Sequence, residues 1–96
     1  MLISDEEARE LAGLFKIFAD PTRVKIIFAL KDKESSVGEL ANIVGLSLSA
    51  ISHQLRLLKA HRIVKNRKEG TMVYYSLDDE HVYELISQGY DHIGHI

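Results

Sequence analysis

The fold is decided by residues 36–60, which read SVGELANIVGLSLSAISHQLRLLKA. Ser36 and Ser47 each precede an apolar pattern of helical spacing, and a serine at that point caps a helix. Gly45, between the two patterns, suits a helix end with a positive φ. Two short helices joined by a tight turn form a helix-turn-helix. The two expected helices span residues 37–44 and 48–60.

Residues that cap helices or form turns also lie on both sides of this stretch. Ser4 and Glu7 have the spacing of a capping box, and Asp20 precedes Pro21, a proline at the first helical position. Gly70 separates two runs of β-forming residues, which indicates a hairpin. The elements expected outside the central stretch are helices 5–18 and 21–30, strands 63–67 and 72–77, and a last helix over 79–94.

A hairpin directly after a helix-turn-helix is a wing. We therefore expect a mainly α fold with a small β-hairpin, a dimeric winged helix-turn-helix in one domain over residues 1–96. The length of 96 residues fits one small domain, and a chain of this size gains from burying more surface in a dimer. No apolar run reaches the ~20 residues of a membrane span. The start, MLISDEEARE, lacks the basic segment of a signal peptide, so a cytoplasmic protein is expected.

The formal net charge of −2 is a sum of opposite regions. Residues 1–46 carry six basic and eight acidic side chains, net −2. Residues 47–77 carry six basic side chains against Glu69 alone, net +5, and residues 78–96 carry five acidic side chains and no Lys or Arg, net −5. This asymmetry predicts a polyanion site on the basic segment and a cation site on the acidic one.

The helix expected over 48–60 has the pattern of a DNA recognition helix. Its apolar positions, expected to be buried, are Leu48, Ile51, Leu55 and Leu58. The other positions are short or polar at the N-terminal end and basic further along, which suits insertion into the major groove. The candidate DNA contacts here are Ser47, Ser49, Ala50, Ser52, His53, Arg56 and Lys59. Serine hydroxyls can bond base edges, whereas an alanine would contact only a thymine methyl. Phosphate contacts, which give affinity without sequence reading, are expected from Arg56, Lys59, Lys65, Arg67 and Lys68.

Four possible metal ligands share one face of the last helix: Asp79, His81, His92 and His95. His81 lies eleven residues before His92, roughly 16 Å along a helix axis. Zinc holds nitrogen ligands at ~2.0–2.1 Å, so one straight helix cannot bring all four to one ion. The alternative that the sequence leaves open is a polar helix with scattered histidines.

Two copies of this helix, packed antiparallel, would bring the ligands together. Asp79 and His81 of one chain would meet His92 and His95 of the other, giving two equivalent sites per dimer. One carboxylate and three imidazoles suit tetrahedral Zn(II), with Co(II) also possible. The apolar residues expected to form part of the seam are Val82, Leu85, Ile86 and Ile93.

With these features together, the chain resembles the ArsR/SmtB family of metal-responsive winged-helix repressors. The resemblance rests on ADPTR at 19–23, LSLSAISHQL at 46–55 and the C-terminal Asp/His set. It implies a homodimer, paired through its N- and C-terminal helices, that represses metal efflux or resistance genes and leaves its operator DNA when metal binds. It also implies that Ser49, Ser52 and His53 face the major groove. Relatives often carry a polar residue where this chain has Leu48, which puts a base contact there in doubt.

Within that family the sequence favours zinc. Thiol-type members carry a Cys pair near residues 36–40, and this chain has no Cys, which argues against arsenite, cadmium or lead. Nickel and cobalt sensors add ligands at the chain ends, and Met1–Ser4 offers no His. Two alternatives are a Co(II) or Ni(II) sensor and a winged-helix regulator without metal input. An enzyme is not expected, because four protein ligands close the zinc shell. The expected partners are double-stranded operator DNA and a second copy, with no membrane and no small-molecule substrate.

Overall fold

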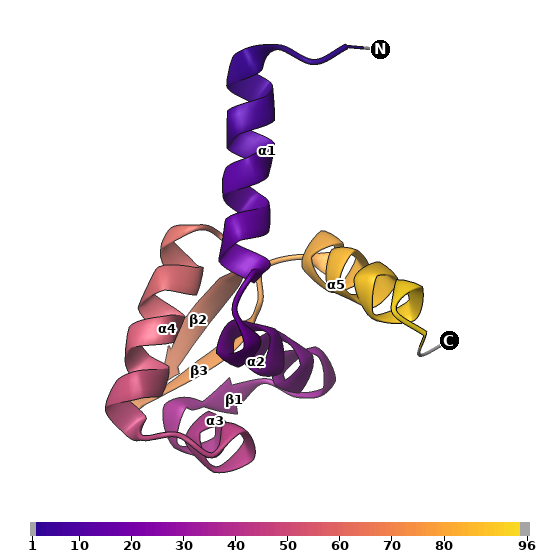
Figure 1. Ribbon diagram of the computed structural model, residues 1–96. Helices are drawn as coiled ribbons and strands as arrows, with labels where there is room; N and C mark the ends of the chain where they lie inside the picture. The colour runs from indigo at the N-terminus through magenta and orange to yellow at the C-terminus, as the bar shows by residue number, and fades with distance from the viewer. Residues whose placement is uncertain (1, 95–96) are drawn as a thin grey trace.

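The computed structural model describes residues 2–94, and within them the chain forms five helices and three strands (Figure 1). In chain order the elements are α1 (Asp5–Phe18), α2 (Pro21–Asp32), β1 (Ser35–Ser36), α3 (Val37–Val44), α4 (Leu48–Ala60), β2 (Val64–Glu69), β3 (Met72–Leu77) and α5 (Glu80–His92). The strands form one antiparallel sheet in the order β1-β3-β2. Helices α3 and α4 are the helix-turn-helix and β2–β3 is the wing, which confirms the fold class.

The helices begin at the caps expected from the sequence. The Ser4 hydroxyl accepts from the Glu7 N–H at 3.0 Å, and the Glu7 carboxylate accepts from the Ser4 N–H at 2.9 Å. Ser36 and Glu39 make the same reciprocal pair at the start of α3. The Asp20 carboxylate caps α2, which opens with a proline. These bonds satisfy N–H groups that have no partner inside the helix.

Gly45 makes the turn between α3 and α4. Its φ is +81°, and its N–H donates to the Ala41 carbonyl at 2.8 Å. An L side chain is strained in this left-handed region, so glycine allows α3 to end and α4 to begin within three residues. The wing turns in the same way at Gly70, where φ is +63°.

The short strand β1 was not expected. Ser35 pairs with Tyr75 and Ser36 with Tyr74, so the wing is anchored to the body through a third strand. Two residues are too few to show the alternation that marks a strand in sequence. Both serines are buried, although serine is mostly exposed in proteins.

The bounds of three elements differ from expectation. Helix α2 continues to Asp32 instead of ending at residue 30, and β2 begins at Val64 and runs on to Glu69. Helix α5 ends at His92 and begins at Glu80, because Asp79 is its extended N-cap and not a helical residue.

The core lies between α2, α3, α4 and the sheet. Its buried apolar residues are Ile17, Ile26, Ile27, Leu30, Leu40, Ala41, Ile51, Leu55, Leu58, Ile63, Val64 and Val82. Helix α1 projects from this core, and α5 lies on the same side of the molecule, away from the α3–α4 corner (Figure 1). No helix within residues 2–94 is long and apolar enough to cross a membrane.

Candidate functional site

Core packing fixes which face of α4 is turned outward. Ile51, Leu55 and Leu58 are fully buried, and the Ser47 hydroxyl caps the helix by accepting from the Ala50 N–H at 3.1 Å. The opposite face is open to solvent, with exposed Ser49, His53, Arg56 and Lys59 and half-buried Ala50 and Ser52. Every candidate DNA contact on this helix is therefore at least partly accessible.

Leu48 does not belong to the buried stripe, and the expectation that it does was wrong. Its side chain is 60% exposed. Helical periodicity places Leu48 on the side of Leu55, but Leu48 is the first residue of α4 and extends beyond the part of the helix that the core covers. The first turn of the recognition helix therefore presents an apolar side chain to solvent.

Arg23 connects the recognition helix to the N-terminal helix. From α2, its Nε donates to the Ile17 carbonyl at 2.6 Å and an η-nitrogen to the Lys16 carbonyl at 3.4 Å, both at the end of α1. The other η-nitrogen donates to Gln54 Oε1 on α4 at 3.3 Å. One side chain thus links three helices. The sequence marked Arg23 only as part of a family signature, and its contact with Gln54, 31 residues away, left no local signal.

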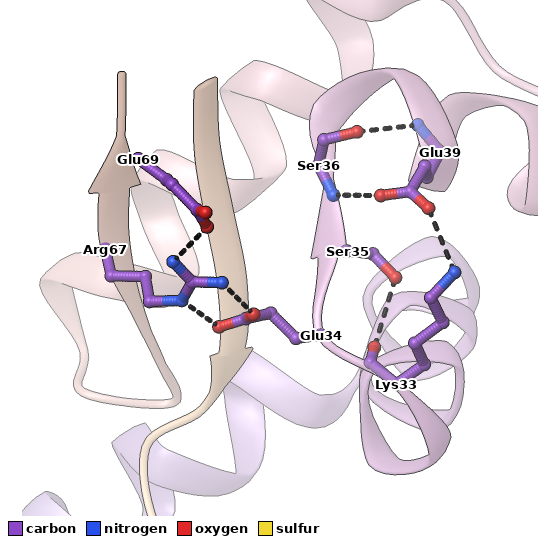
Figure 2. A network of polar contacts seen from close by, with 7 residues as sticks. All are labelled: Lys33, Glu34, Ser35, Ser36, Glu39, Arg67 and Glu69. Atoms are coloured by element: carbon purple, nitrogen blue, oxygen red, sulfur yellow. Dashed lines mark hydrogen bonds and ion pairs between the residues drawn. The ribbon is translucent and has the colours of Figure 1, made fainter. Parts of the chain in front are cut away.

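Arg67, expected to contact phosphate, is already paired within the chain. Its guanidinium bonds both Glu34 carboxylate oxygens, at 2.7 and 2.8 Å, and Glu69 at 2.7 Å (Figure 2). It also lies 5.0 Å from the centre of the Tyr74 ring. The hydrogen bonds from Arg67 lower the pKa of Glu34, and the two carboxylates raise the pKa of Arg67. Its charge is compensated locally, and the contact ties the wing to the loop before β1.

The other two basic wing residues are unpaired. Within residues 2–94, neither Lys65 nor Lys68 forms an ion pair, and both are exposed. They are the wing side chains whose charge is available to an outside polyanion.

Two candidate metal ligands lie together at the start of α5. The Asp79 carboxylate caps the helix by accepting from the N–H groups of His81 at 2.9 Å and Val82 at 3.3 Å. The same oxygen lies 3.5 Å from His81 Nδ1, and the two side chains are 51% and 83% exposed. The caps use Asp79 Oδ1, and the structure gives Asp79 Oδ2 no hydrogen bond within residues 2–94.

The other two candidate ligands belong to the opposite end of α5. His92 is its last helical residue and is exposed, while His95 lies outside the described residues. Within residues 2–94, no three His, Cys, Asp or Glu side chains of one chain converge on a possible metal position. The described candidate ligands therefore lie at both ends of one helix, and a single copy does not bring them together.

An apolar groove of about 300 Å³ runs between α1, α2 and α5. It is lined by Phe15, Phe18, Val24, Phe28, Leu85, Ile86, Gly89, Tyr90 and Ile93. Phe15 is 52% exposed and Ile93 73%, large values for apolar side chains gathered on one face. Val82, expected at a dimer seam, is buried in the core of its own chain instead, because the first turn of α5 packs inward.

Comparison with known proteins agrees with this architecture. A family model described as "Bacterial regulatory protein, arsR family" matches residues 20–66. The chain is 42% identical to the "Transcriptional repressor SmtB homolog" of Synechocystis sp., over 96% of this chain and 70% of that one. It is 45% identical to the "Cadmium resistance transcriptional regulatory protein CadC homolog" of Staphylococcus aureus, over 94% of this chain and 75% of that one.

A solved structure shares the fold. The homodimeric winged helix-turn-helix DNA-binding domain of Mb0332 from Mycobacterium bovis superimposes with a TM-score of 0.79 at 31% identity, covering 94% of this chain and 86% of that one. The relatives are transcriptional regulators, which confirms the expectation that this chain is not an enzyme. On this evidence the chain belongs to the ArsR/SmtB family of metal-responsive transcriptional repressors.

Proposed function

We propose that this chain is a homodimeric, zinc-sensing repressor. The metal-free dimer binds operator DNA, and Zn(II) bound at the C-terminal helices lowers that affinity and derepresses metal efflux or resistance genes. The observation that carries the proposal is the arrangement of α5. Accessible Asp79 and His81 lie at its start and accessible His92 at its end, beside an apolar groove that a second copy would cover.

The dimer follows from the groove between α1, α2 and α5. Two of the helices that line it, α1 and α5, lie on the side of the molecule away from the α3–α4 corner, so a second copy can pack there and leave both recognition helices free. The similar domain from Mycobacterium bovis is homodimeric, which supports a dimer for this chain. In this proposal residues 1–96 act as one DNA-binding domain whose α1 and α5 are the dimerisation helices.

The metal site needs both protomers. Asp79 and His81 of one chain and His92 and His95 of the other supply one carboxylate and three imidazoles, a donor set that suits zinc. The residues present fit the ion, because Asp79 keeps Oδ2 for a metal while Oδ1 caps α5. The twofold axis makes two such sites per dimer. Co(II) accepts the same ligands and stays an alternative, as does Ni(II).

The operator is read by α4 and held by the wing. The proposed contacts are Ser47, Ser49, Ala50, Ser52, His53, Arg56, Lys59, Lys65 and Lys68. The sequence also predicted Arg67 as a phosphate contact, but Glu34 and Glu69 already compensate its charge. Two recognition helices must lie about 34–36 Å apart to enter successive major grooves. Bound metal fixes the angle between the paired α5 helices. If that angle changes the distance between the two recognition helices, DNA affinity falls. This is a coupling free energy between two sites.

The wing lysines and Arg67 are expected to differ in their effect on DNA binding. Lys65→Gln removes an unpaired charge that can neutralise one phosphate, so the slope of log affinity against log salt should become less negative by about one. Arg67→Gln removes a charge that two carboxylates already compensate, so we expect an unchanged slope. Fluorescence anisotropy at several salt concentrations measures both slopes, and a slope that becomes less negative for Arg67→Gln would instead show that Arg67 contacts phosphate.

One observation favours a regulator without metal input. The Asp79 carboxylate caps α5, which is reason enough for an aspartate at this position. If Asp79 serves only as a cap, the histidines of α5 are ordinary surface residues. This alternative keeps the dimer and the operator but removes the response to zinc.

A DNA titration tests the proposal. Duplexes are first selected from a random-sequence library with the metal-free protein, and the affinity for the selected duplex is then measured with and without Zn(II). We expect zinc to weaken binding by roughly 5–150-fold, the usual range of coupling between two sites. Selective DNA binding that ignores zinc would support the regulator without metal input, and no enrichment of any duplex would overturn DNA binding itself.

A further inference from the structure

The recognition helix begins with an exposed leucine. Leu48 is the first residue of α4 and is 60% exposed. A single exposed leucine on a protein surface is ordinary. At this position, however, an exposed leucine is placed to contact DNA, because the N-terminal residues of a recognition helix are those that approach base edges.

The side chains around Leu48 leave it prominent. The Ser47 hydroxyl is occupied as the helix cap, and the Ser49 hydroxyl lies 3.3 Å from it, within hydrogen-bond distance. Ala50 is half-buried and short, so it is a poorer candidate for the apolar contact that its residue type allows. Leu48 is the largest exposed apolar side chain in this first turn.

The major groove offers one apolar group to such a side chain. Base edges there present hydrogen-bond donors and acceptors, and thymine adds its C5-methyl. Leucine cannot donate or accept a hydrogen bond, so a donor or acceptor that it covers loses its water without compensation. Contact with a thymine methyl removes apolar surface from water on both sides.

Ser52 lies beside Leu48 and can contact the base next to the thymine. It lies four residues after Leu48 and therefore on the same side of α4, about 6 Å further along the helix. It is partly accessible, and its hydroxyl can bond an adjacent base. The two residues together suit a thymine next to a base pair that is read by hydrogen bonding.

We propose that Leu48 is a specificity-determining residue that selects a thymine in each operator half-site through the C5-methyl. The proposal rests on the operator binding proposed above.

Deoxyuridine tests this contact directly, because it differs from thymidine only by the missing methyl. Duplexes selected by the full chain from a random-sequence library are remade with each thymine replaced in turn. At one position per half-site we expect the wild-type affinity to fall roughly fourfold per methyl, the value of one buried methyl-sized group. The same replacement should leave the affinity of Leu48→Ala unchanged, while Met72→Ala, which alters an exposed apolar residue on the wing, should keep the wild-type sensitivity.

The outcomes separate this proposal from the one it rests on. If the protein enriches specific duplexes but tolerates deoxyuridine at every position, thymine reading is refuted and operator binding stands. If Leu48→Ala stays as sensitive as the wild type, another residue contacts the methyl and Leu48 is not the determinant. If no duplex is enriched, operator binding fails, and thymine reading fails with it.

Discussion

Replacing Phe15 with Glu is expected to convert the dimer to a monomer and to lower operator affinity by more than roughly 100-fold, because an uncompensated charge buried in an interface costs ~3–5 kcal/mol. Phe15 lies on α1 and lines a surface depression together with Leu85 and Asp91. A glutamate there would be buried against apolar side chains and near a second carboxylate. A monomer carries a single recognition helix and cannot bind two half-sites at once.

Sedimentation and DNA titration measure this prediction together. Phe15→Leu is the matched control, because it keeps an apolar side chain of similar reach and should stay dimeric with near wild-type affinity. Phe15 is half exposed in the single chain, so the glutamate variant should keep its helical circular dichroism. A Phe15→Glu variant that still sediments as a dimer would show that the groove is not the interface.

Replacing His92 with Ala is expected to weaken zinc binding by more than roughly 100-fold, since even the loss of an outer-shell partner costs about 10–100-fold in metal affinity. His92 is exposed at the end of α5 and remote from the core. The apo dimer should therefore bind operator DNA within about twofold of wild type, and zinc should no longer release it.

His61→Ala is the matched control for His92. His61 is also an exposed histidine at the end of a helix, with Nδ1 3.0 Å from the Leu57 carbonyl, but it belongs to no ligand set. Zinc titration of both variants, with a competing chelator, gives affinity and stoichiometry. Loss of DNA binding by the metal-free His92→Ala dimer would make this residue structural, and unchanged zinc affinity would remove it from the site.

Local chemistry made most of the fold predictable. Ser4, Ser36, Ser47 and Gly45 act within one helical turn of their own position, so their roles can be recognised from neighbouring residues alone. The strand β1 was missed because its pairing partners, Tyr74 and Tyr75, lie far along the chain on β3. Pairing between residues so far apart in the sequence cannot be predicted from local residue patterns.

The candidate site was less predictable than the fold, for a similar reason. Periodicity treats a helix as covered along its whole length, and this assumption failed at Leu48, where the core ends. Arg67 looked like a free cation because its partner Glu34 is 33 residues away. The face of α5 could be derived from spacing, but a site shared by two chains needs a second copy that one sequence does not describe.

The three-way bond of Arg23 has a mechanical consequence. Its guanidinium fastens the end of α1 to Gln54, beside the reading face of α4. In the proposed dimer, this joint would make α1, near the twofold axis, and α4, at the DNA, move together. A rotation of α1 relative to the α1 of the partner would then move α4 as well. Because α4 lies further from the axis, a small rotation would displace it further in the DNA major groove. The coupling between metal and DNA in the proposed dimer would therefore depend on this joint as well as on the affinity of each site.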